Sequence, residues 1–419
     1  MSDTRAYHSA SSVDLLLQGG FYLLVASIPF EYPERTIPME VPTLTATVFL
    51  LATFLHPSRC YGRLPGAFIG FGLYLLAFLL ATVSGGEHGS EAFSEFIIVL
   101  QGVLVFLAAG NLMRDDKVAT RAMATLVAAC AARACLPLLG FARTTSTVWT
   151  GGERVSALGQ NANSAAMILA AGMVVLIGLA YGHRHRTRMG LVFTGALGGL
   201  LGFAVLETGS RGGLLALLGG VFVFALAADS LRARLRNALI GVVAISLLVL
   251  GTLHLPVMKN RWEDSMKTGN LAGREQLYPA LWNMFLEKPV LGWGPVTNTY
   301  ELASRIGERE RPHRAAHNIV LELLTATGLV GTLPFLIGGW LCARHAWRAR
   351  RGEHGVLPLA LLGSVLISNM SGDWIASKLI WLALAVAYAS GQWSEVLVTA
   401  PVRRTLASPA LALQRSRGL

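Results

Sequence analysis

The residues best suited to chemistry gather most densely in the stretch RPHRAAHNIVLELLTATGLVG. It places Arg311, His313, Arg314 and His317 directly before a long apolar segment. Guanidinium groups bind anions, and an imidazole exchanges protons near neutral pH. The pattern therefore predicts a site where a charged substrate meets a proton acceptor at the mouth of a membrane helix. The alternative is an interfacial histidine that only forms local hydrogen bonds.

Small and aliphatic residues repeat at helical spacing after His317. Leu321, Leu324, Gly328 and Gly331 fall within about 40° of His317 on a helix that turns 100° per residue. This spacing predicts a stripe on which a neighbouring helix packs closely and fixes the position of the imidazole.

Other arginines lie at the ends of other apolar segments. Arg211, in ETGSRGG, precedes two glycines that permit close backbone approach to a ligand. The loop 140–160 holds Arg143 and Arg154, and Asn161 opens the polar entry to the next segment. We expect these groups to contact an anionic substrate. Snorkelling of Arg211 to lipid phosphates and helix capping by Asn161 are the simpler explanations.

The stretch GREQLYPALWNMFLEK, from Gly273 to Lys288, has the apolar periodicity of an amphipathic helix. It predicts a helix lying on the outer membrane surface, with Tyr278 and Trp282 at headgroup level. Arg274 would lie in its first turn. The positive end of a helix beside an arginine predicts an anion site.

Ionisable residues also fall inside apolar segments, where charge is a sign of function by default. Asp373 and Lys378 lie at the outer end of the last such segment, where a structural ion pair is the alternative to substrate binding. Arg133 has no evident partner. Glu322 lies roughly 140° round the helix from His317, so it needs a partner elsewhere.

The seven aspartates include no Asp-x-Asp pair in an outer connection, the arrangement expected of a divalent metal that bridges a pyrophosphate. We therefore expect no metal and no other cofactor, and phosphate chemistry that relies on arginine. A P-loop is also missing, which excludes direct use of ATP through that motif.

Hydrophobic residues make up 53% of the 419 positions and charged residues 14%, the composition of an all-α polytopic membrane protein. Apolar runs near or above the roughly 18 residues that cross a bilayer recur along the chain. We predict about twelve spans, near 13–30, 38–56, 66–83, 92–110, 118–139, 163–182, 189–207, 213–229, 237–255, 318–341, 356–370 and 374–392.

The net charge of +11 reflects topology better than nucleic-acid binding, because Lys and Arg concentrate in alternate connections. Both termini are therefore expected in the cytoplasm, with no removable signal peptide. This divides the chain into nine spans (1–255), a large periplasmic loop (256–316), three spans (317–392) and a basic cytoplasmic tail (393–419). None of the four cysteines lies in an outer loop, so no structural disulfide is expected.

In combination, these motifs resemble the bacterial O-antigen ligase family and the related O-antigen polymerases and protein O-oligosaccharyltransferases. The matching stretches are RVSALGQNANSAAMIL, TGSRGG, GREQLYPALWNMFLEKPVLGWGP and HNIVLELLTATGLVG, in that order around a large late loop. The resemblance is good from Arg154 to Gly331 and rests on hydropathy elsewhere.

The resemblance implies a GT-C-like fold in the bacterial inner membrane and a transfer reaction at its periplasmic face. His317 would be the catalytic base, and Arg211 and Arg274 would hold the pyrophosphate of an undecaprenyl-pyrophosphate-linked glycan donor. The acceptor would be a lipid A core sugar, and the transfer would be inverting and metal-independent. Chain length and the single large late loop favour the ligase over the protein O-oligosaccharyltransferase, while the polymerase remains open. A transporter or flippase of lipid-linked anions is the main alternative of another class, and a lipid-binding scaffold is a weaker one.

Overall fold

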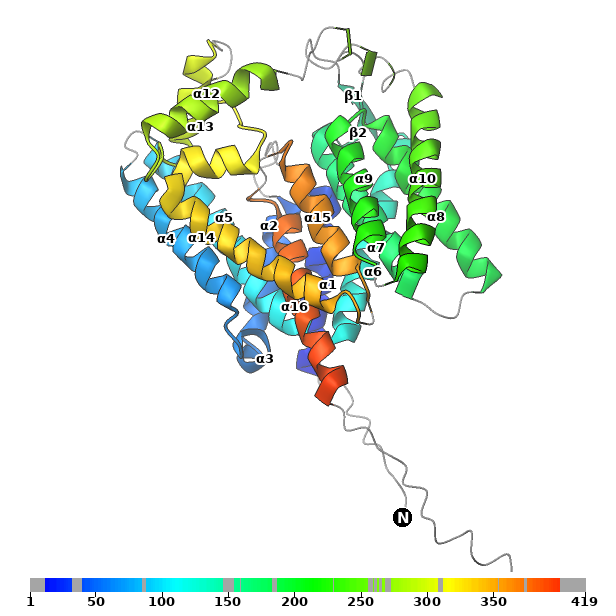
Figure 1. The fold of residues 1–419 in the computed structure, drawn as a ribbon. Coiled ribbons are helices and arrows are strands. Elements are labelled where there is room, and N and C mark those ends of the chain that lie inside the picture. The colour runs from blue at the N-terminus through cyan, green and yellow to red at the C-terminus, as the bar shows by residue number, and fades with distance from the viewer. Residues whose placement is uncertain are drawn as a thin grey trace, which may run out of the picture.

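Over the part of the chain that the structure describes, the protein is almost entirely helical (Figure 1). The computed structural model describes residues 12–31, 40–84, 88–145, 154–158, 160–182, 187–228, 230–254, 273–307, 312–352, 354–372 and 375–399, with isolated residues between 259 and 267. The long elements are α1 Ser12–Ser27, α2 Val41–Thr53, α4 Gly66–Ser84, α5 Gly89–Leu112, α6 Asp116–Cys135, α7 Ala162–Gly182, α8 Arg188–Glu207, α9 Arg211–Leu226, α10 Leu231–His254, α12 Arg274–Glu287, α14 Ile319–Ala349, α15 Leu357–Asn369 and α16 Lys378–Thr399.

The short elements are α3 Pro57–Tyr61, α13 Thr297–Arg305 and the 3₁₀ turns η1 Ile28–Phe30 and η2 Pro137–Leu139. One antiparallel hairpin pairs strand β1, Ala142–Thr145, with β2, Arg154–Ala157. It lies where the sequence indicated only a loop. The β-branched residues of ARTT and RVSA favour this extended pairing.

Seven of the described helices are long and apolar enough to cross a membrane, and three shorter apolar helices accompany them. Helices α10 and α16 occupy the two remaining predicted spans. Each of the twelve predicted spans thus coincides with a helix, and the prediction of an all-α polytopic membrane protein is confirmed. The largest difference in length is at α14, which continues to Ala349.

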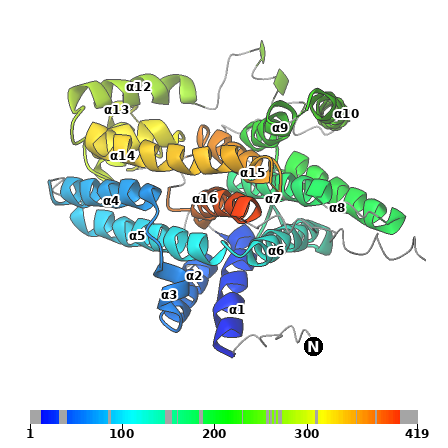
Figure 2. The ribbon, with the colours of Figure 1, turned by 60° about the horizontal axis from the view of Figure 1, so that its bottom comes forward.

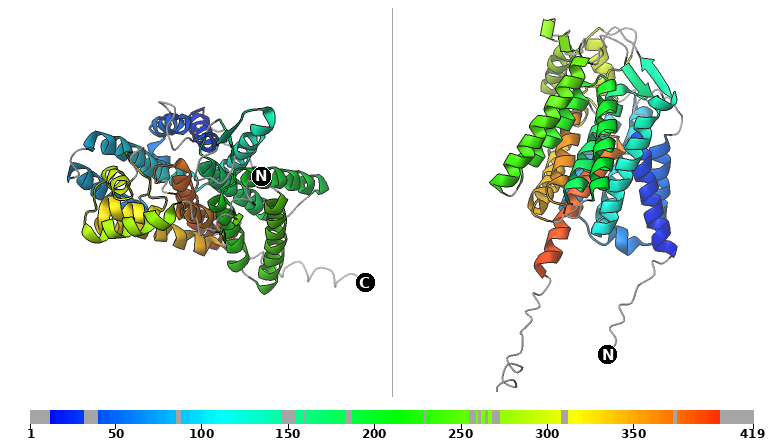
Figure 3. Two further views of the ribbon diagram at one scale, coloured as in Figure 1. Left: turned by 90° about the horizontal axis from the view of Figure 1, so that it is seen from above. Right: turned by 90° about the vertical axis from the view of Figure 1, so that its right-hand side faces the viewer.

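The two ends of the helix bundle differ. Helices α12 and α13 and the β1–β2 hairpin lie at one end, which we call the loop end (Figures 1 and 3). Helix α1 begins and α16 finishes at the opposite end (Figure 3). This is the arrangement that an even number of spans produces.

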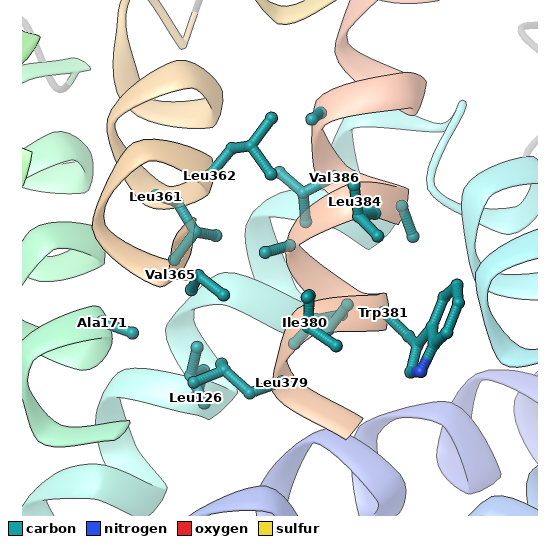
Figure 4. Close-up of a cluster of buried hydrophobic side chains, with 14 of the residues drawn as sticks. Leu126, Ala171, Leu361, Leu362, Val365, Leu379, Ile380, Trp381, Leu384 and Val386 are labelled. Carbon is teal, nitrogen blue, oxygen red and sulfur yellow. The ribbon is translucent and has the colours of Figure 1, made fainter. Parts of the chain in front are cut away.

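Helix α16 runs through the middle of the bundle, between α14 and α15 on one side and α5 and α6 on the other (Figure 2). Its residues from Lys378 to Ala389 are buried, including Trp381 in the cluster of Figure 4. The Trp381 ring meets Phe71 edge-on with ring centroids 5.3 Å apart, and Gly102 leaves room for the indole. A helix that is apolar on all sides is expected at such a central position. The four cysteines are unpaired with one another, as predicted.

The predicted amphipathic helix is α12, which begins after Gly273 (φ 82°). Its apolar residues Leu277, Leu281 and Met284 are buried against Leu302 of α13 and Ala316. This apolar face is therefore buried within the protein, while Trp282 remains exposed, and the location of α12 at the membrane surface stays a prediction. A periodic pattern shows that a face is covered but not by what, and here the chain that follows covers it.

Candidate active site

His317 lies just outside α14. The helix begins at Ile319, and Asn318 is its N-cap, with a side-chain oxygen that accepts from the N–H groups of Val320 (3.0 Å) and Leu321 (3.2 Å). His317 has a φ of 52°, in the left-handed region that few non-glycine residues adopt. The predicted stripe below His317 is therefore wrong, because it assumed that His317 was helical. Such backbone conformations cost about 1–3 kcal/mol and cluster at functional sites.

Tyr278 of α12 holds the backbone of His317. Its hydroxyl lies 3.3 Å from the carbonyl oxygen of His317 and 3.2 Å from that of Met370, just after α15. A hydroxyl has one proton, so the two carbonyl groups share a single donor. Tyr278 thus joins α12 to the start of α14 and the end of α15. The predicted location of Tyr278 at headgroup level stays a prediction.

Arg274, the first residue of α12, reaches the same place. Its Nη2 donates to the carbonyl oxygen of Ser371 at 3.1 Å. The guanidinium of Arg314 lies near Gly273, where an added Cβ would be 3.9 Å from Nη2. Two guanidinium groups therefore adjoin the N-terminus of α12, whose partial positive charge adds to theirs.

Helix α9 brings Arg211 to this region. The helix begins at Arg211, and the Oγ of its N-cap Ser210 accepts from the N–H of Gly213 at 3.2 Å. Gly212 packs directly against the side chain of Ser371 and leaves no space for a Cβ. The N-terminus of a second helix thus lies beside the carbonyl that Arg274 binds.

The segment Met370–Ser371 is therefore a meeting point, which we call the α15 turn. Helix α12 contacts it through Arg274 and Tyr278, and α9 contacts it through the residue after Arg211. The Tyr278 hydroxyl ties it to His317. Three residues distant in sequence, Arg211, Arg274 and His317, are thus gathered around one turn at the loop end. Figure 1 shows α9, α12, α14 and α15 converging there.

Arg154 is buried, with 6% of its surface exposed, and braces this arrangement. Its Nε donates to the carbonyl oxygen of Thr208 and its Nη2 to Oδ1 of Asn163, both at 2.8 Å. The same Asn163 oxygen accepts from Ser210 Oγ at 3.0 Å. Asn161 accepts the N–H of Asn163 at 2.8 Å. Arg154 and Asn161 therefore position the turn that leads into α9.

Helix α14 is broken at Gly328, whose φ of 59° and ψ of −160° are not helical. The loop PVLGWGP after α12 crosses the break and supplies backbone partners. The N–H of Trp293 donates to the carbonyl oxygen of Thr325 at 2.7 Å, and that of Leu329 donates to Pro289 at 2.8 Å. Backbone hydrogen bonds on both sides of the break thus attach the loop to the helix. Gly328 was predicted to serve helix packing, and the structure corrects this.

An ion pair fastens α12 to α13. Arg305 donates to both carboxylate oxygens of Glu287, at 2.6 Å each, and this hydrogen-bonded pairing lowers the pKa of Glu287. Arg305 also donates to Glu301 at 2.7 Å. The Lys288 ammonium lies 3.8 Å from the ring centroid of Trp293. These contacts therefore hold α12, the loop that follows it and α13 to one another.

Glu322 and Lys378, two charged residues of the apolar segments, each have a partner in the structure. Asn298 donates to Glu322 at 2.8 Å, so Glu322 fixes α13 to α14. Glu31 accepts the N–H of Lys378 at 2.9 Å and the hydroxyl of Ser377 at 2.5 Å. The charges of Glu31 and Lys378 also interact, although both residues are buried. This favours the structural explanation of Lys378.

Arg133 extends the same network. Its Nε donates to Oε1 of Gln160 at 2.7 Å, and Gln160 donates to the carbonyl oxygen of Glu31. All three residues are buried. The network connects the end of α6, the entry to α7, the end of η1 and the start of α16. Polar groups buried in this way stabilise a unique arrangement only when they are hydrogen-bonded.

Three of the predicted site residues have no described side chain. Arg311 and Asp373 lie outside the described residues, and Arg143 is described only by its backbone, which pairs with Ser156 in the hairpin. His313 is described and exposed. Among the described residues, no three His, Cys, Asp or Glu side chains are grouped so that they could hold a metal ion.

The sequence did not identify Tyr278 or the α15 turn as parts of the site. Tyr278 has the amphipathic spacing of an interfacial tyrosine, and nothing in its neighbours distinguishes a hydroxyl aimed at two distant carbonyl groups. The α15 turn acts through its backbone. Its only sequence signal is the small, polar SGD after an apolar segment, which is typical of an ordinary loop.

Residues 196–336 match a family model described as O-antigen ligase. The matched segment contains Arg211, Arg274 and His317, together with Tyr278 and Arg314. A search of curated proteins found no match.

Proposed function

We propose that this membrane protein is a glycosyltransferase that moves an O-antigen glycan from undecaprenyl pyrophosphate to a lipid A core sugar, because residues 196–336 match a family model described as O-antigen ligase. The observation that carries the proposal is the gathering of Arg211, Arg274 and His317 around the α15 turn. In this proposal the protein lies in the bacterial inner membrane. Its loop end faces the periplasm, and both termini lie in the cytoplasm.

The donor pyrophosphate binds at the N-termini of α9 and α12. Arg211 and Arg274 occupy the first positions of these helices, and Arg314 lies beside the second. Guanidinium groups and helix N-termini both favour phosphate oxygens. The same groups stabilise the charge that develops as the pyrophosphate leaves. No metal ion is required for this step.

The acceptor hydroxyl binds at His317, whose imidazole takes up the proton. The hydroxyl oxygen forms a bond to the anomeric carbon of the donor sugar while the bond from that carbon to the phosphate oxygen breaks. Undecaprenyl pyrophosphate leaves with the bonding electrons, and the sugar configuration is inverted. The neutral imidazole is the form that can act as a base.

We expect His317→Ala to abolish transfer, by at least about 100-fold, which is the lower end of what general base catalysis contributes. The measurement is single-turnover transfer by purified protein in nanodiscs, with lipid-linked donor and lipid A core acceptor. His56→Ala, at the opposite end of the bundle, is the matched control and should retain the wild-type rate. A wild-type rate in a folded His317→Ala protein would contradict the assignment of the base.

Arg211→Ala tests the donor site separately. We expect it to raise the donor KM far more than the acceptor KM, because its partner is the pyrophosphate. Equal changes in both constants would contradict this role. The reaction should also survive excess EDTA, and complete loss of transfer there would contradict metal independence.

The acceptor separates this proposal from its alternatives. When wild-type protein is offered lipid A core and a second lipid-linked glycan together, a ligase joins the glycan to the first and a polymerase to the second. A transporter of lipid-linked anions would form neither product and would move the donor across the membrane of a sealed vesicle.

A further inference from the structure

A group of aromatic rings lies at the loop end near His317. The rings of His88 and Tyr300 are stacked, with centroids 3.8 Å apart and planes inclined by 7°. The ring of His313 follows at 6.0 Å from Tyr300, inclined by 55°. The Tyr300 hydroxyl donates to Glu91, at 3.3 Å and 3.5 Å from its two carboxylate oxygens. We call these four residues the ring cluster.

The ring cluster is open to solvent. His313 and Glu91 are exposed, and His88 and Tyr300 are half-buried. Its members come from three separate segments: the start of α5, helix α13 and the strand-like stretch before His317. Stacked rings and a carboxylate that are brought together from three segments, yet left uncovered, are suited to contacting a ligand.

The position of the ring cluster relative to His317 is fixed. The N–H of Arg314, next to His313, donates to the carbonyl oxygen of Thr299, next to Tyr300, at 3.0 Å. Asn298 holds the start of α13 to Glu322 of α14. These bonds tie the ring cluster to the segment that leads into His317 and to α14.

Resting on the proposed function, we propose that the ring cluster binds a sugar ring of the acceptor glycan. The face of an aromatic ring is electron-rich and attracts the polarised C–H groups on the apolar side of a sugar. A carboxylate accepts hydrogen bonds from two neighbouring sugar hydroxyls. The ring cluster contains no Arg or Lys, so it suits an uncharged sugar better than the donor pyrophosphate. An acceptor sugar bound there would lie on the segment that leads into His317.

The test is the transfer kinetics of Tyr300→Ala and Glu91→Gln in the full chain, with donor and acceptor concentrations varied separately. We expect each change to raise the acceptor KM roughly tenfold, as for the loss of a stacked ring or a charged hydrogen bond, and to leave the donor KM within about twofold. Tyr300→Phe keeps the ring and loses the bond to Glu91, so its effect should be smaller than that of Tyr300→Ala.

Phe93→Ala is the matched control, because Phe93 is an exposed aromatic residue in the same first turns of α5. Its acceptor KM should equal that of the wild type. An unchanged acceptor KM in Tyr300→Ala would overturn the proposal, and so would a raised donor KM alone, which would mean that the ring cluster holds the donor glycan.

Saturation-transfer NMR with free, lipid-less core oligosaccharide keeps this inference separable from the proposed function. Transfer of saturation to the sugar in the wild type, lost in Tyr300→Ala, supports the ring cluster even if no glycan transfer is detected. If the wild type transfers glycan but the saccharide signal is the same in the wild type and in Tyr300→Ala, the inference is contradicted and the proposed function is not. Thermal unfolding of each variant identifies any that fail to fold.

Discussion

At the scale of residues, the conformation of His317 is the most informative feature. A non-glycine residue at φ 52° is strained, and the surrounding structure must hold it there. The Asn318 cap holds it from one side and the Tyr278 hydroxyl from the other. The sequence identified His317 as a candidate from its neighbours alone. Its backbone conformation could not be predicted, because it depends on Tyr278, 39 residues away.

Tyr278→Phe should therefore lower the rate of glycan transfer. The variant keeps the ring and leaves the carbonyl groups of His317 and Met370 without the donor that they share, a change of about 0.5–1.5 kcal/mol for the one hydrogen bond lost. We expect kcat to fall roughly tenfold with both KM values unchanged, since the imidazole is misplaced while both substrates still bind. Titration with donor counts the active sites. A lower number of sites with a normal rate per site would mean that Tyr278 only stabilises the fold.

At the scale of elements, the break in α14 decides how the late loop is attached. Loops usually contact a helix through side chains, but PVLGWGP exchanges backbone hydrogen bonds with it. Two glycines with positive φ make this possible: Gly292 lies against the backbone of Thr325 and Ala326, and Gly328 lies against Val290. Both occur in stretches whose hydropathy predicts only a loop and a helix. The contact is long-range, so a local pattern cannot reveal it.

Gly328→Ala should be strongly destabilising, because a Cβ would press on the Val290 carbonyl and the backbone conformation itself disfavours alanine by about 1–3 kcal/mol. Gly339→Ala, later in α14, meets nothing within 4 Å and should raise stability by about 0.5–1 kcal/mol. The measurement is the thermal unfolding midpoint of both variants in the same detergent. Equal midpoints would show that the break contributes nothing to stability.

At the scale of the whole molecule, the sequence was most informative about the membrane and least informative about the site. Hydropathy is a local property, so twelve spans could be placed from it. The meeting of α9, α12, α14 and α15 depends on packing between distant segments, which hydropathy does not encode. The charges between spans predict which end of the bundle faces the periplasm.

Cysteine labelling tests that orientation. In a variant that lacks the four native cysteines, Ser304→Cys on α13 and Ser58→Cys on α3 place exposed thiols at opposite ends of the bundle. We expect a membrane-impermeant maleimide added outside spheroplasts to label position 304 and not position 58. The reverse result would invert the topology and remove the proposed periplasmic site.

The α15 turn also has a consequence for biosynthesis. Chains are made from the N-terminus at about 5–20 residues per second, and Arg211, Arg274 and His317 all leave the ribosome before Met370 and Ser371. Until α15 has been inserted, Arg274 and Tyr278 lack the carbonyl groups that they bind in the finished protein. The nascent chain therefore carries these residues early, and their surroundings are completed only when α15 is inserted.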